Sequence, residues 1–382
     1  MGPDSEVIEV PSVEYYRNCH LVPASKMYNL AWADKQYKVG QIICEAFRSD
    51  DSPIAAQPRK VAKQQLMRLE SAGYRLYSAF EIEFFVVDAQ TTKPVYDNIQ
   101  KHADLALSKN ARWIYDIENH LRKLDINIEY LHTEDAAGQF EFCMKPKYGL
   151  DVFDDLFVMK EAMKEILAQH GVKPTFMSRP FENCTSAFHF NHSLWNSDGK
   201  NVFYDESMAL NMSDTFRYWM GGLIKHTNSL AALCNPTPNC FRRFHEHLAP
   251  SGADWGIDDR RITFRVKNIG AGGSYVENRL PSSACNPYIV VAATIAAGLD
   301  GIENKIEPPK LGKQQSSPKI GSYSECLDDL KNNTVLNNAL GKEFLDWWLA
   351  IKQHENVRFG SSSHETMSKD IEAERKFYFD MI

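Results

Sequence analysis

The sequence has 382 residues, of which 43% are hydrophobic and 12% aromatic, enough to bury a sizeable core in one large or two ordinary domains. The formal net charge is −7, and neither sign is gathered in one block. Phosphate backbones and anionic lipids attract basic patches, so this distribution argues against nucleic-acid and membrane partners and favours small molecules or proteins.

Strand and helix patterns alternate through the first half of the chain. Two strand-like segments flank a charged turn, and a helix ended by Gly73 leads into an aromatic strand. The expected strands are residues 28–33, 41–47, 74–87, 126–133, 139–144, 174–177 and 186–195. The expected helices are residues 59–71, 113–124 and 152–170. This mixture predicts an α+β protein with antiparallel strands.

The second half of the chain is increasingly helical. A long helix over 213–234 precedes the last two strands, residues 262–266 and 274–280. Four further helices are expected at residues 288–299, 324–331, 335–353 and 369–378. The stretch 308–319 is rich in Pro, Gly, Ser and Lys and is expected to form a loop.

Two features of the sequence bear on its compartment. No apolar run approaches the roughly 18 residues of a membrane span, and the start MGPDSEVIEV lacks the basic and apolar regions of a signal peptide. The eight cysteines show no C-x-x-C spacing, so they are interpreted as reduced thiols and not as a disulfide framework or a zinc site. We therefore expect a cytoplasmic protein.

A pair of glutamates stands in the aromatic strand. Glu81 and Glu83 are two residues apart, so on a strand both carboxylates leave the same face. Two like charges at this spacing repel, and a bound cation, a basic neighbour or water must offset the repulsion. A solvated strand face is the simpler interpretation of this pair alone.

Other acidic and basic side chains have similarly ordinary interpretations when taken singly. Glu134 and Glu141 bracket a turn containing Gly138 that can direct both acids toward one point, although each acid by itself is typical of a surface. Strand alternation places His189, Asn191 and Ser193 on one face, where a single histidine is more often structural than a ligand. The same alternation joins Glu277 with Arg279, usually a simple salt bridge.

Taken together, these residues favour a cation site. Five glutamates and one imidazole suit hard, oxygen-preferring ions such as Mg²⁺ or Mn²⁺ and disfavour zinc bound through cysteine. Five arginines add donors that can clamp phosphate or carboxylate groups in a fork geometry, namely Arg242, Arg243, Arg260, Arg261 and Arg265. An acidic cradle beside such arginines is the layout expected for phosphoryl transfer from a nucleotide.

An ordered series of motifs resembles the glutamine synthetase superfamily in its type I form. The motifs are EIEFF (81–85), GQFE (138–141), TFM (175–177), NPTPN (235–239), NPY (286–288) and AAGLDG (296–301). The resemblance covers nearly the whole chain and implies a catalytic domain with a curved antiparallel sheet flanked by helices over residues 54–382. Residues 1–53 would be part of an N-terminal β-grasp domain, with the chain starting partway through it.

The resemblance also implies roles for individual residues. One metal would be held by Glu83, Glu134 and Glu141, and a second by Glu81, His189 and Glu277. The amino-acid carboxylate and the transferred phosphate would face Arg243, Arg260 and Arg279, while Arg265 and Ser193 would belong to the nucleotide side. Members of the family phosphorylate the γ-carboxylate of glutamate with ATP and let ammonia displace the phosphate.

Several positions depart from the family pattern. The flap that ends in Gly-Tyr-Glu-Ala-Pro is FHEHLAP (244–250) here, so Leu248 stands where the proton-accepting acid belongs and Glu246 is the candidate substitute. The glutamate-binding Asn-Gly pair is replaced by Cys184 and Thr185, and a histidine near the nucleotide is replaced by Asn191. Basic positions around Gly272 and Tyr275 are also replaced. The N-terminal loop that donates an ammonium-binding aspartate to the neighbouring subunit is not matched.

Within the superfamily, VENRL (276–280) and HSLW (192–195) are most similar to the lengsins, associated with the vertebrate eye lens. This likeness implies a structural, cytoskeletal or chaperone-like protein without glutamine synthetase activity, with intermediate filaments as possible partners. The alternative is an active ATP-dependent ligase that joins glutamate to ammonia or another amine, which the complete ligand set favours. The resemblance further implies a ring-shaped homo-oligomer, a dodecamer of two stacked rings.

Overall fold

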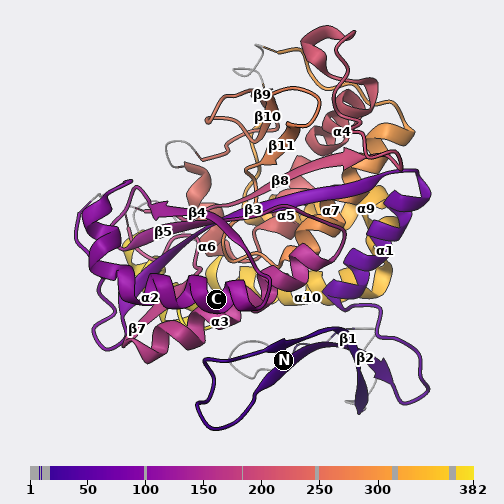
Figure 1. The fold of residues 1–382 in the computed structure, drawn as a ribbon. Helices are drawn as coiled ribbons and strands as arrows, with labels where there is room; N and C mark the ends of the chain where they lie inside the picture. The colour runs from indigo at the N-terminus through magenta and orange to yellow at the C-terminus, as the bar shows by residue number, and fades with distance from the viewer. Residues whose placement is uncertain are drawn as a thin grey trace.

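The computed structural model describes residues 8, 10, 18–98, 101–182, 184–245, 249–311, 317–360 and 367–382, which form an α+β protein as predicted (Figure 1). The strands are β1 (Cys19–Asn29), β2 (Gly40–Arg48), β3 (Arg75–Asp88), β4 (Ile128–Thr133), β5 (Gln139–Met144), β6 (Lys147–Tyr148), β7 (Val172–Thr175), β8 (Phe188–Trp195), β9 (Trp255–Ile257), β10 (Phe264–Asn268) and β11 (Ser274–Asn278). The helices are α1 (Pro58–Ser71), α2 (Asp104–Lys123), α3 (Asp151–Gln169), α4 (Asp214–Lys225), α5 (Thr227–Cys234), α6 (Pro238–Phe241), α7 (Pro287–Glu303), α8 (Tyr323–Asn332), α9 (Thr334–Leu340), α10 (Lys342–Phe359) and α11 (Met367–Tyr378).

A nine-stranded sheet organises the molecule around β3 and β8. Its strands follow the order β4-β5-β3-β8-β11-β10-β9, and β6 and β7 pair with the two ends of β3. Neighbouring strands are antiparallel apart from β9, which runs parallel to β10. The predicted antiparallel sheet is therefore confirmed, with one parallel pair at its edge.

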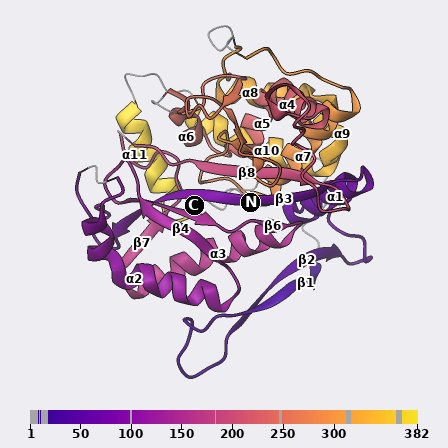
Figure 2. The same cartoon turned by 45° about the horizontal axis from the view of Figure 1, so that its top comes forward.

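Strand β3 is central because its side chains alternate between two environments. Phe80, Ile82 and Phe84 are fully buried, and Phe80 packs edge-on against Phe153 of α3. In the view of Figure 2, α2 and α3 are drawn below β3 and β8, and α4, α5 and α7 to α10 are drawn above them. The two groups of helices are in contact, because the hydroxyl of Tyr288 in α7 donates to Asp154 of α3 at 2.5 Å. Since alternate residues of a strand face opposite ways, this apolar row sends the intervening glutamates to the other face of the sheet.

Helix α7 is apolar around its whole circumference, which is typical of a helix at the centre of a protein. Its close contact with α4 depends on glycine. A Cβ atom on Gly222 would lie 2.1 Å from the carbonyl oxygen of Ala297, and one on Gly301 would lie 2.0 Å from that of Tyr218. The backbones of α4 and α7 can pack this closely only because these two positions carry no side chain.

The N-terminal strands form a separate two-stranded sheet, which polar contacts attach to α3. Arg59 pairs with Asp154 through two nitrogens, each 2.9 Å from a carboxylate oxygen, and with Glu45 of β2 at 2.8 Å. The Tyr28 hydroxyl donates to Asp155 at 3.1 Å. This bidentate pair and its neighbours fix the β1–β2 sheet against the larger part of the molecule.

Two predicted helices are each divided in the structure. The expected helix over 213–234 breaks at His226, between α4 and α5. The one over 335–353 breaks at Gly341, whose φ of 91° ends α9 before α10 begins. Residues 312–316 of the expected loop lie outside the described residues. Among the described helices, none is long and apolar enough to cross a membrane.

Candidate functional site

A cavity of about 940 Å³ opens on the face of the sheet opposite the apolar row of β3. Its walls come from β3, β4, β5, β8, β10 and β11 and from the loops that join them. The predicted ligands and arginines that line it are Glu81, Glu83, Glu134, Glu141, His189, Glu277, Arg243, Arg260, Arg265 and Arg279. Ten residues spread over nearly 200 positions of sequence are thus brought into one place.

Strand register explains part of this convergence. Glu81 of β3 stands directly opposite His189 of β8, and Glu83 stands opposite Glu141 of β5. Nδ1 of His189 lies 3.1 Å from Oε2 of Glu81 and 3.6 Å from Oε1 of Glu277. These three residues place one ligand atom each within 4.8 Å of one another, the same trio that the sequence resemblance implies.

Hydrogen bonds and nearby charges hold Glu81 of this first cluster, Glu81–His189–Glu277, in its charged form. Burial by itself raises the pKa of Glu81, but the hydrogen bond and charge of His189 outweigh it and lower that pKa to about 2. Asn191 also donates to Glu81, at 2.8 Å. The Glu277 carboxylate forms ion pairs with two guanidinium groups, with Nη1 of Arg279 2.6 Å from Oε1 and Nη1 of Arg265 2.8 Å from Oε2. The cluster therefore contains an ionised Glu81, a Glu277 carboxylate paired with two arginines, and one imidazole.

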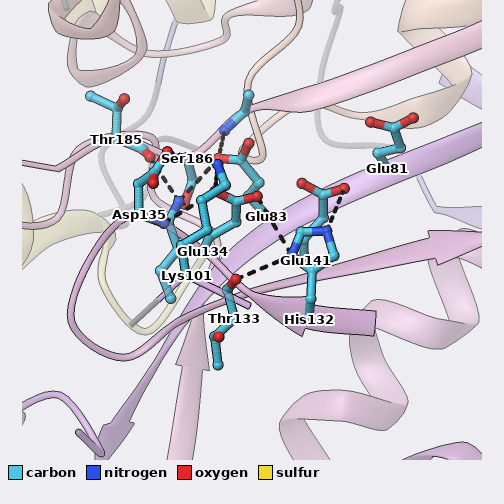
Figure 3. A network of polar contacts seen from close by, with 12 residues as sticks. Glu81, Glu83, Lys101, His132, Thr133, Glu134, Asp135, Glu141, Thr185 and Ser186 are labelled. Carbon is cyan, nitrogen blue, oxygen red and sulfur yellow. Dashed lines mark hydrogen bonds and ion pairs between the residues drawn. The ribbon is translucent and has the colours of Figure 1, made fainter. Parts of the chain in front are cut away.

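The second cluster contains a histidine that the sequence reasoning missed. Oε1 of Glu134 and Oε1 of Glu141 each lie 3.6 Å from a different nitrogen of His132 (Figure 3). Burial lowers the pKa of His132, but the hydrogen bond and charge of Glu141 outweigh this and raise it. The available signal was strand alternation, because His132 precedes Glu134 by two residues.

Glu83, which the resemblance assigns with Glu134 and Glu141, has different neighbours in the structure. Its Oε2 accepts hydrogen bonds from the amide of Gln139 at 3.0 Å and from the backbone N–H of Ala187 at 2.8 Å. Burial and the charges of Glu141 and Glu134 raise its pKa to about 7. Among the described residues, the ligand atoms of Glu134 and Glu141 group with His132 and not with Glu83.

Lys101 is a second residue that the sequence reasoning missed. Its ammonium nitrogen lies 2.9 Å from Oε2 of Glu134 and 2.8 Å from Oδ2 of Asp135. The lysine precedes α2 and is separated from Glu134 by 33 positions. No local pattern in the sequence links residues at that separation.

The arginines divide into those that line the cavity and those that are directed away from it. Arg243 is 2% exposed and donates to the backbone carbonyls of Arg279 and Leu280, and burial lowers its pKa to about 10. Arg260 is exposed at the rim. Arg242 is directed elsewhere, since it binds Glu374 of α11 at 2.9 Å and does not line the cavity.

The remaining site predictions concern Arg261, Ser193 and two residues of the flap sequence. Arg261 pairs with Asp259 at 2.8 Å on the surface, so it does not contribute to the cavity either. Ser193 lies on β8 but is absent from the cavity lining, and its hydroxyl accepts from the indole of Trp195 at 2.9 Å. Glu246 and Leu248 lie outside the described residues.

The replaced glutamate-binding positions do reach the cavity. Cys184 and Thr185 both line it, and the backbone oxygen of Thr185 accepts from Gln139 at 2.9 Å. The eight cysteines are not joined in disulfides, as predicted, and the thiol of Cys143 donates to Glu141 at 3.1 Å.

This fold, with carboxylates on one face of an antiparallel sheet and arginines across from them, defines a glutamine-synthetase-type catalytic domain. Residues 55–371 match the family described as glutamine synthetase, catalytic domain. The chain belongs to this family.

Its similarity extends to both enzymes and lengsins. Glutamine synthetase of Thermotoga maritima is 32% identical over 353 residues, covering 87% of this chain and 80% of that protein. Lengsin of Rattus norvegicus is 29% identical over 373 residues, covering 92% of this chain but only 64% of the lengsin. The chain thus spans less than two thirds of that lengsin's length.

Solved structures of GmaS have the same fold. The structure titled "Apo GmaS without ligand" superposes with a TM-score of 0.83 at 26% identity, covering 96% of this chain and 86% of that chain. A GmaS complex with ADP gives a TM-score of 0.82 at 25% identity, covering 94% of this chain and 87% of that chain.

Proposed function

We propose that this protein is a lengsin-like glutamine synthetase homologue that binds divalent cations but makes no glutamine, and that it acts as a structural or assembly protein. One observation carries the proposal: the carboxylates and the imidazole that the resemblance implies as ligands line one cavity. By the same resemblance, the positions that handle glutamate and ammonia in the family have changed. The acids meet in the cavity, while Cys184 and Thr185 stand where the family has Asn-Gly and Leu248 stands at the flap acid.

The donor set fits Mg²⁺ or Mn²⁺. Carboxylate oxygens and one imidazole are ligands that these ions accept, and several partly or fully buried carboxylates in one cavity repel one another unless cations neutralise them. We assign Glu81, His189 and Glu277 to one ion and Glu83, Glu134 and Glu141 to the other. When bound, such ions would neutralise phosphate oxygens of a ligand.

The arginines supply anion-binding capacity beside the acids. Arg243, Arg260 and Arg279 are assigned to carboxylate or phosphate groups, and Arg265 to a nucleotide phosphate. Arg265 is already paired with Glu277 at 2.8 Å, so a nucleotide must share it with that carboxylate. The replacement of the nucleotide-side histidine by Asn191, which donates to Glu81, removes another donor from that side. We therefore leave ATP as an optional ligand.

The altered positions explain why ammonia would not be used. Ammonia is mostly ammonium near neutral pH, so a ligase must remove a proton and keep water from the acyl phosphate. Leu248 has no group that accepts a proton. Thr185 adds a side chain where the family has glycine, which reduces the room for the amino acid. Glu246 remains the only residue of the flap sequence that we assign as a substitute base.

A working ligase with a different amine is the second candidate. The presence of all six proposed ligands in one cavity and the similarity to GmaS, for which an ADP complex is known, favour it. The two candidates differ in turnover. Phosphate release from ATP with glutamate and a panel of amines, from ammonia to bulkier primary amines, separates them. If none of the amines causes phosphate release, the non-catalytic proposal is supported. Phosphate release that depends on an amine supports the ligase.

Metal binding is tested independently of turnover. Titration calorimetry with Mn²⁺ is expected to show binding in the parent and loss of binding in Glu83→Gln combined with Glu141→Gln. An exposed glutamate on β4, Glu129, provides the matched control Glu129→Gln, which should bind like the parent. Absence of heat in the parent would contradict the cation site.

The proposed assembly role concerns the surface of the molecule. Members of this family are typically homo-oligomers, and we propose a ring dodecamer in which neighbouring copies cover exposed strand edges. We also propose that residues 1–53 and 54–382 are two structural units, which the separate β1–β2 sheet supports. A cytoplasmic location and intermediate-filament partners complete the proposal.

A further inference from the structure

Lys101 is positioned at the acidic end of the cavity by hydrogen bonds of the two residues that follow it. The N–H of His102 donates to the carbonyl of Thr133 at 3.0 Å, and the N–H of Ala103 donates to the Thr133 hydroxyl at 3.0 Å. These bonds attach the segment before α2 to the end of β4. Lys101 is thereby held next to Glu134, the residue that follows Thr133.

Both carboxylate oxygens of Glu134 face groups of this chain. Oε2 accepts from the ammonium of Lys101 at 2.9 Å and from the backbone N–H of Asp135 at 3.1 Å. Oε1 lies 3.6 Å from Nδ1 of His132 (Figure 3). The Glu134 side chain is only 11% exposed, so water has little access to replace these partners.

A lysine differs from an arginine in ways that matter at this position. Its ammonium is a compact charge on a flexible stem with rotatable donors, whereas the planar guanidinium of an arginine is pre-organised to grip a carboxylate. The Lys101 side chain is 36% exposed, and Asp135, its second partner, is 59% exposed. The ammonium can therefore leave Glu134 toward solvent, where the exposed carboxylate of Asp135 remains as its partner.

We propose that Lys101 is a tethered counter-cation that occupies Glu134 and that a divalent ion must displace to bind there. The inference rests on the proposed cation site and adds that the chain itself supplies the competing charge. An ammonium and a divalent ion that contact the same carboxylate repel each other strongly, because the cavity wall screens charge less than water does. Lys101 thus lowers the affinity of the Glu134 position for metal.

The first test compares Mn²⁺ affinity by calorimetry in the parent, Lys101→Met and Lys101→Arg. Removal of the competing charge is expected to tighten binding at one position on the order of tenfold, whereas the arginine variant keeps the charge and does not tighten it. Lys267 lines the same cavity but pairs with Asp258 at 2.6 Å, so Lys267→Met is the charge-matched control.

A gain in affinity confined to Lys101→Met supports the inference. An equal gain in Lys267→Met shows only a general effect of net charge and overturns it, as does unchanged or weaker binding in Lys101→Met. No binding in either the parent or Lys101→Met overturns both this inference and the proposed cation site. Binding in the parent that Lys101→Met leaves unchanged overturns the inference alone.

A second test needs no variant. Acetylation by a water-soluble acylating reagent, followed by peptide mass spectrometry, measures how accessible the amino group of each lysine is to reagent in solution. Addition of Mg²⁺ is expected to increase acetylation of Lys101 in step with metal binding, while Lys267 serves as the internal reference. Acetylation of Lys101 that does not respond to saturating Mg²⁺ means that the ammonium stays on Glu134, and it overturns displacement.

Discussion

The raised pKa of Glu83 gives a quantitative prediction for the metal-free protein. The pKa of its carboxyl group moves from an ordinary value of 4.5 to about 7, through burial and the charges of Glu141 and Glu134. Between these two pH values the folded protein holds a proton that the unfolded chain has lost. Stability therefore falls as the pH rises from about 4.5 to about 7, and the full cost applies above that range.

The substitution Glu83→Gln removes this cost while keeping the hydrogen bonds. A glutamine carbonyl oxygen can accept from both Gln139 and Ala187, as Oε2 of Glu83 does now. One pKa unit corresponds to about 1.4 kcal/mol, so a shift of this size amounts to at most about 3 kcal/mol. The variant is expected to be more stable than the parent by that order at pH 8 and by much less at pH 5.

Urea unfolding in the presence of a chelator measures the effect. The free energy of unfolding of the parent, Glu83→Gln and the surface control Glu129→Gln is compared at pH 5 and pH 8. The parent and Glu129→Gln should lose stability across this range, whereas Glu83→Gln should lose less. Parallel pH dependences for the parent and Glu83→Gln would refute the reasoning that Glu83 is held in a buried, like-charged environment.

Two further predictions concern packing and assembly. Gly222→Ala would place a methyl group 2.1 Å from the carbonyl oxygen of Ala297 and force α4 away from α7, so the free energy of unfolding should fall by about 1–3 kcal/mol or more. Gly272→Ala is the control, because a Cβ atom there meets nothing within 4 Å. Equal stability of the two variants would contradict the close approach of α4 and α7. Light scattering should report a ring-sized homo-oligomer at micromolar concentration, and a monomer would contradict the proposed assembly.

The fold was largely predictable because hydrophobic periodicity is a local signal. Strand β5 and helix α1 match their predicted ranges closely, and alternation in β3 and β8 placed Glu81 and His189 on one face. Helix interruptions were less visible. The break at Gly341 depends on a φ of 91°, which a single glycine in a helical pattern does not require.

The partners of the site residues were harder to predict because they depend on distant segments. Arg242 and Arg243 are adjacent in sequence, yet Arg242 binds Glu374, 132 positions away, while Arg243 lines the cavity. Lys101 reaches Glu134 only because the segment before α2 is bonded to Thr133. Charge type was readable from the sequence, whereas the pairing of charges required the three-dimensional arrangement.

A glutamine-forming assay with ATP, glutamate and ammonium tests whether this protein lacks ligase activity. Loss of one positioned proton-transfer group typically costs about 10²- to 10⁴-fold, so a flap without its acid should leave turnover near background. We expect the parent to form no more glutamine than Glu81→Ala, which lacks one of the clustered carboxylates. Ordinary ligase turnover in the parent that Glu81→Ala abolishes would contradict the non-catalytic function and identify Glu246 as the candidate base.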